Sequence, residues 1–96
     1  MTLEEFKQGL ITAQISLTSL PSALQALYHD KMGNLEEAHN IVVNAIDNNS
    51  AWVHAYLHRK EGDIDNARYW YQRSGKPEFF GGLDEEWEQI ATQLLE

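Results

Sequence analysis

Two histidines, His54 and His58, stand four residues apart in the segment AWVHAYLHRKEGD. On a helix this spacing places both imidazoles on one side, one turn apart, in an arrangement that can chelate a metal ion. Glu61 follows three residues later on nearly the same line, so His54, His58 and Glu61 form a candidate ligand set. A zinc site also needs a ligand from another element. Metal binding is therefore the less favoured interpretation, and a polar surface pair is the favoured one.

The same histidines fit a second chemistry, which is the binding of an anion. Arginine binds carboxylates and phosphates through a planar fork, and tyrosine and histidine add directional donors. The candidate residues for binding a ligand or partner are His54, His58, Arg59, Tyr69 and Arg73. In the alternative interpretation the bases pair with nearby acids or with the acidic run DEEWE near the end of the chain. That pairing closes the last helix over the basic segment.

The overall charge narrows the classes of partner. The chain has 15 acidic and 7 basic residues, for a net charge of -8. A field of that sign repels phosphate backbones, so we expect no nucleic-acid partner. Five of the seven bases nevertheless lie between Arg59 and Lys76, which makes this stretch locally basic.

The composition also narrows the chemistry and the location. The chain has no cysteine, which excludes disulfides and thiolate chemistry. Acids occupy the N-terminal region where a signal peptide needs bases, and no apolar run approaches the roughly 18 residues that cross a bilayer. We therefore expect a cytoplasmic protein with no membrane association. No Gly-rich loop, serine-nucleophile context or paired-carboxylate arrangement stands out, so we predict no cofactor and no catalytic residue.

Six helices are expected to position the candidate residues, because apolar positions recur at helical spacing and no stretch alternates as a strand does. Asn34, Asp63 and Asp84 are the expected N-caps, and Gly33 and Gly62 are the expected helix ends. The expected helices cover about 3–14, Pro21 to Gly33, Asn34 to the DNNS segment that breaks the helix, 50–61, 64–74 and 84–95.

The fourth expected helix carries the two histidines. Its apolar residues Trp52, Val53, Tyr56 and Leu57 define one buried side. We expect His54, His58 and Glu61 to fall roughly opposite, toward solvent. His39 lies at the edge of the apolar stripe of the preceding helix and is interpreted as a boundary residue. In the loop GKPEFFGG, we expect Phe79 and Phe80 to pack on the core.

An internal repeat organises the middle of the chain. YHDKMGNLEEAHNIV and LHRKEGDIDNARYWY align without a gap, with Gly62 matching Gly33 at an offset of 29 residues. Each unit contains a helix, a glycine turn and a capped helix, which is the pattern of an α-hairpin repeat. We predict one all-α domain, 1–96, with repeat-like units at about 22–47 and 50–75, a loop at 75–83 and a C-terminal helix at 84–95.

These units resemble tetratricopeptide repeats, most closely in GDIDNARYWY, although the offset is shorter than the usual 34 residues. The resemblance implies helical hairpins packed as short TPR-like repeats, about six helices in a compact bundle, and a protein-interaction role. A closer resemblance covers about residues 20–95. The run W-V-H-A-Y-L-H-R-K-E-G-D, followed by N-A-R-Y-W-Y, is similar to a family of small, uncharacterised bacterial proteins of about a hundred residues. That resemblance implies no particular activity.

Two functions from different classes follow. The favoured one is a small cytoplasmic TPR-like interaction or scaffold module that binds a protein or peptide, with self-assembly into a homo-oligomer left open. The alternative is a protein that binds a small anionic ligand, or an enzyme. There His54 or His58 acts as acid or base while Arg59 or Arg73 holds the anion. Of the two, the non-enzymatic role is favoured, because repeat architecture suggests binding.

Overall fold

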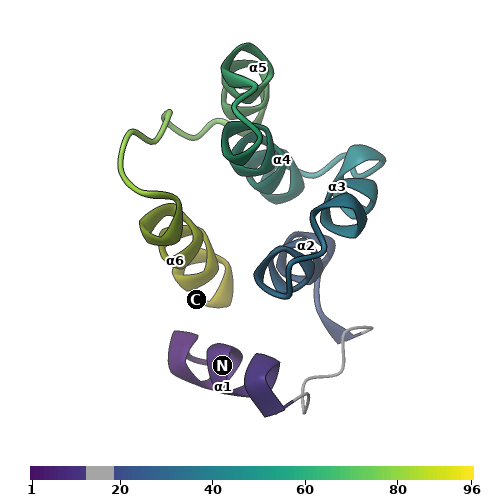
Figure 1. Ribbon diagram of the computed structural model, residues 1–96, viewed down its shortest axis with the longest axis vertical. Helices are drawn as coiled ribbons and strands as arrows, with labels where there is room; N and C mark the ends of the chain where they lie inside the picture. Colours follow the sequence, from purple (N-terminus) through teal and green to yellow (C-terminus); the bar gives the residue numbers. More distant parts are fainter. Residues whose placement is uncertain (13–18) are drawn as a thin grey trace.

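The computed structural model describes residues 1–12 and 19–96, and this part of the chain is all helical (Figure 1). The helices are α1 (Leu3–Thr12), α2 (Ser22–Lys31), α3 (Leu35–Val43), α4 (Asn48–Lys60), α5 (Ile64–Ser74) and α6 (Leu83–Leu95). The all-α prediction is confirmed for the described residues. The predicted end of the first helix and the start of the connection after it lie outside them.

Two helix starts differ from the sequence prediction. The side chain of Asp47 accepts a hydrogen bond from the backbone N–H of Ser50 at 2.9 Å. The segment DNNS therefore begins α4 instead of only breaking the previous helix. At α6, Gly82 takes the N-cap position with an extended backbone, so Asp84 lies inside the first turn. There its negative charge is attracted by the positive end of the helix dipole, and it does not serve as the N-cap.

The turns after α2 and α4 have the same geometry. Gly33 and Gly62 both adopt a left-handed conformation with φ of 82°. In each turn the residue after the glycine donates its N–H to a carbonyl in the last turn of the helix. These bonds join Asn34 N to His29 O at 2.8 Å and Asp63 N to His58 O at 2.9 Å. The chain reverses at both points, so α2 packs with α3 and α4 packs with α5. We call these two pairs the first and second hairpins.

Helix α4 packs against α2, α3, α5 and α6. In Figure 1 it lies between α5 and the pair formed by α2 and α3. Every residue from Ser50 to Leu57 is buried. The prediction of a solvent-facing side for His54 is therefore wrong, because only 2% of this residue is exposed. The amphipathic pattern of α4 correctly located one buried side. It did not show that α3 and α5 cover the other.

Helix α6 closes the core from the C-terminal end of the chain. Trp87 stacks on Phe6 of α1 with ring centroids 5.9 Å apart, and its indole N–H donates to the carbonyl of Leu27 in α2 at 3.1 Å. In the loop before α6, Phe79 is partly buried against the core, as predicted. Phe80 is 83% exposed, so its predicted packing is wrong. In the described segments, no helix has the length and apolar character that a membrane crossing requires.

We predict that Ile90→Ala and Ile46→Ala differ sharply in their effect on stability, although the chemical change is the same. Ile90 of α6 is fully buried, and Ile46, between α3 and α4, is 88% exposed. Ile90→Ala should lower the free energy of unfolding by about 2–5 kcal/mol. Ile46→Ala should change it by less than about 0.5 kcal/mol. Urea denaturation followed by circular dichroism measures both, and equal effects would contradict this assignment of the core.

Candidate metal centre

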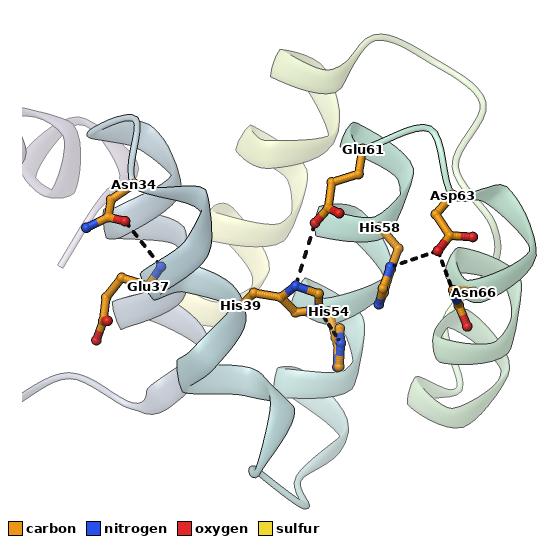
Figure 2. A network of polar contacts seen from close by, with 8 residues as sticks. All are labelled: Asn34, Glu37, His39, His54, His58, Glu61, Asp63 and Asn66. Carbon is orange, nitrogen blue, oxygen red and sulfur yellow. Dashed lines mark hydrogen bonds and ion pairs between the residues drawn. The ribbon is translucent and has the colours of Figure 1, made fainter.

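Three histidines meet at the junction of α3 and α4 (Figure 2). His39 comes from α3, and His54 and His58 lie one turn apart on α4. One ring nitrogen of each histidine lies within 4.8 Å of the other two. The closest pair is His39 Nε2 and His54 Nε2, which form a hydrogen bond of 2.8 Å. Helix α3 therefore supplies the ligand from another element that the sequence pair lacked.

Buried alanines flank the cluster in the sequence. Ala38 of α3 directly precedes the half-buried His39, and Ala55 of α4 directly follows His54. Both alanines are fully buried. His39 therefore lies on α3 next to a core position, at the boundary between the core and the surface.

An aromatic ring of the second hairpin packs against the histidine cluster. Trp70 of α5 stacks on His54 with ring centroids 4.0 Å apart and planes 20° from parallel. His54 in turn lies nearly parallel to His58 at 4.9 Å. Tyr69 is exposed and meets Trp70 edge-on at 5.1 Å. The Trp70 ring therefore forms one wall of the cluster and restricts rotation of the buried His54 ring.

Two carboxylates lie behind the cluster. Glu61 Oε1 is 3.6 Å from His39 Nδ1, and Asp63 Oδ2 is 3.6 Å from His58 Nδ1 (Figure 2). Asp63 also accepts a hydrogen bond of 2.6 Å from the side-chain amide of Asn66. Both carboxylates therefore face the nitrogen of their histidine opposite to Nε2. In metal sites, a carboxylate at that position orients the imidazole and raises its basicity.

Burial keeps the α4 histidines neutral. It lowers the pKa of His54 to about 4, with further lowering by the nearby rings of His39 and His58. Burial also lowers the pKa of His58, as does His39, while the carboxylates of Glu61 and Asp63 act in the opposite direction. Both rings are consequently unprotonated near neutral pH. That is the state in which an imidazole nitrogen can bind a metal ion.

The cluster leaves polar atoms without partners. Among the described residues, His54 Nδ1 and His58 Nδ1 are buried and make no hydrogen bond. The 3.6 Å approach of Asp63 Oδ2 to His58 Nδ1 is longer than a hydrogen bond, and with the His58 ring neutral it is not an ion pair. A buried polar atom without a partner costs about 1–3 kcal/mol. Packing of the apolar core alone does not account for gathering three imidazoles at this cost.

The spacing of the three nitrogens suits a small divalent ion. Zinc–nitrogen bonds of about 2.0–2.1 Å at tetrahedral angles place two ligand nitrogens roughly 3.3 Å apart. The cluster has one separation of 2.8 Å, and its largest lies within 4.8 Å. Side-chain movements of roughly 1 Å would bring all three nitrogens to the separation that zinc requires.

The predicted anion-binding residues do not form one site. Arg59 NH1 donates to Glu86 Oε1 of α6 at 2.8 Å, and NH2 donates to the carbonyl of Gly81. Tyr71 donates to the other carboxylate oxygen of the fully buried Glu86. Arg59 thus pairs with the acidic run DEEWE, as the charge-pairing alternative predicts. Its guanidinium is held by α6 and the loop before it, and not by the histidine cluster.

The remaining predicted residues lie near Trp70. The guanidinium carbon of Arg73 is 5.9 Å from the centre of the Trp70 ring, which also contacts Tyr69. A surface pocket of about 280 Å³ lies on the Arg59 side of the second hairpin and the loop after it. It is lined by Arg59, Ile64, Ala67, Arg68, Tyr71, Glu78, Phe79 and Phe80. The structure thus groups His54 and His58 with His39, and places Arg59 at a separate surface.

Comparisons of the chain with protein-family models, with curated proteins and with solved structures found no match. The two resemblances noted in the sequence therefore stay predictions.

We predict that His54 makes the stability of the metal-free protein depend on pH. Its pKa is lowered from 6.5 to about 4 in the folded state. As pH falls, the unfolded chain therefore takes up a proton on His54 at a higher pH than the folded protein does. The free energy of unfolding is highest above pH 6.5 and decreases as pH falls toward 4. Between pH 7 and 4.5, the wild type should lose about 2 kcal/mol more than His54→Gln loses over the same interval.

Urea denaturation in the presence of a chelator measures this difference. Each protein is compared with itself at the two pH values, so a constant loss of packing in His54→Gln cancels. Identical pH dependence in the two proteins would show that His54 is not the buried neutral group described here.

Proposed function

We propose that this protein binds one divalent transition-metal ion, with zinc as the preferred ion, through His39, His54 and His58. The observation that carries the proposal is the convergence of three imidazole nitrogens from two helices within 4.8 Å. Neutral imidazole is a common ligand for zinc, copper, nickel and iron. Sets of three histidines are used for zinc in proteins.

The surroundings support the same assignment. Glu61 and Asp63 stand at the outer nitrogens of two of the histidines, where second-shell carboxylates act in metal sites. Trp70 covers His54 and holds its plane. The hydrogen bond between His39 and His54 would be exchanged for two bonds to the ion. This ligand set replaces the weaker one predicted from the sequence, because Glu61 lies behind His39 and not beside His54 and His58.

Binding would add a metal cross-link between two hairpins that otherwise meet through packing and polar contacts such as the Tyr56–Asp30 hydrogen bond. His39 belongs to the first hairpin, and His54 and His58 belong to the second. An ion bound by all three would cross-link α3 to α4. Because the unfolded chain has no preformed site, the binding free energy adds to the free energy of unfolding.

The partner-binding role predicted from the sequence stays a prediction and concerns another surface. The exposed Phe80 and Ile64 line the pocket beside Arg59, and such apolar residues suit contact with a partner. Arg73, which the sequence prediction also named, does not line this pocket and contacts the ring of Trp70 instead. Pull-downs that recover equal amounts of the same proteins with wild type, Phe80→Ala and Arg73→Ala would argue against a partner at either surface.

We expect the untagged, chelator-treated protein to bind one zinc ion per chain in isothermal titration calorimetry. His39→Ala and His58→Ala should each weaken binding by more than 100-fold, since loss of even a second-shell partner costs about 10–100-fold. At a zinc concentration 100 times the dissociation constant, wild type should gain about 2.7 kcal/mol of stability.

The matched control is His29→Ala. His29 lies in α2 and packs edge-on against Tyr28, away from the cluster. This variant should bind zinc as the wild type does. Equal affinity of all four proteins, or equal weakening by His29→Ala, would contradict the proposed site.

A further inference from the structure

We infer that the bound ion keeps one coordination position open and that a small monoanion, of the size and charge of azide, binds to the metal there. This inference rests on the metal site proposed above. It extends that proposal from holding an ion to recognising an exogenous ligand.

Among residues 1–12 and 19–96, the protein supplies three ligand atoms and no fourth at this cluster. Within the described segments, the cluster of metal-binding side chains contains His39, His54 and His58 alone. Structural zinc sites are closed by four protein ligands, whereas sites with three keep a position for water or another ligand. The number of histidines therefore places this cluster with the open sites.

The nearest carboxylates are in the wrong place to close the site. Glu61 and Asp63 approach Nδ1 of His39 and of His58, while His39 Nε2 points to His54. If Nε2 of His39 binds the ion, Nδ1 and its carboxylate lie on the far side of the ring. Glu61 then supports a ligand from behind, and moving it onto the ion would end that contact.

Charge and access favour a small anion. Three neutral imidazoles leave a double positive charge on the ion and its direct ligands, which Glu61 and Asp63 offset only from behind two of the rings. An anion at the open position would meet that charge directly, in a partly buried site where the attraction is strong. The side chains of His39 and His58 are 28% and 13% exposed, so the edge of the cluster reaches solvent. Trp70 covers one face of His54, so a ligand has to approach from another side of the cluster.

Cobalt-substituted protein provides the test, because the visible absorption of Co²⁺ changes when its ligands change. We expect the visible bands of the Co²⁺ protein to shift during a titration with sodium azide and to reach saturation below about 100 mM, a concentration that would mark a weak site. Sodium perchlorate at the same concentrations, which coordinates metals poorly, controls for ionic strength and should leave the bands unchanged. His29→Ala should respond to azide as the wild type does.

Glu61→Gln separates the open site from a closed one. If Glu61 only supports His39, this variant loaded with Co²⁺ still responds to azide. If wild type shows Co²⁺ bands that azide does not shift, while Glu61→Gln responds, Glu61 fills the fourth position and the inference is wrong. Bands that azide shifts in neither protein also overturn it. Failure of Co²⁺ to produce any cluster-dependent bands would instead overturn the proposed metal site itself.

Discussion

Helix α4 is covered by four other helices, and this burial determines where its polar side chains find partners. A polar group that loses water must be paired inside the protein or it destabilises the fold. Three polar side chains of α4 turn to three different neighbouring helices. The partners are Asp30 of α2 for Tyr56, Glu86 of α6 for Arg59 and His39 of α3 for His54. The histidine cluster is therefore one of three polar contacts that fix the helices around α4.

The other two contacts contain full charges and are closed. Asp30 accepts from the Tyr56 hydroxyl at 2.8 Å and from Lys60 Nζ at 2.7 Å, so both carboxylate oxygens are used. Burial, together with the negative charge of Asp30, raises the pKa of Tyr56 above its usual range. Glu86 is likewise shared by two donors. The histidine cluster differs because burial keeps the rings of His54 and His58 neutral and one nitrogen of each ring remains unpaired.

The sequence predicted local features better than tertiary ones. Gly33 and Gly62 end helices as expected, because a left-handed residue there depends on the local backbone. Asn34 caps α3 by accepting from the N–H of Glu37. The role of His39 was missed, since a helical wheel places it at the edge of one stripe and does not identify the helix opposite. Only the packing of α3 on α4 shows that this edge faces His54.

The histidine cluster lies across the junction of two units that each form from neighbouring segments. Each hairpin is closed by its own glycine turn, so His54 and His58 can reach their mutual arrangement as soon as α4 is helical. His39 arrives only when the first hairpin docks. An ion held by all three would select the docked state from any partly opened ensemble. The lifetime of the bound ion would then be coupled to the rate at which α3 separates from α4, and the bound metal would slow that separation.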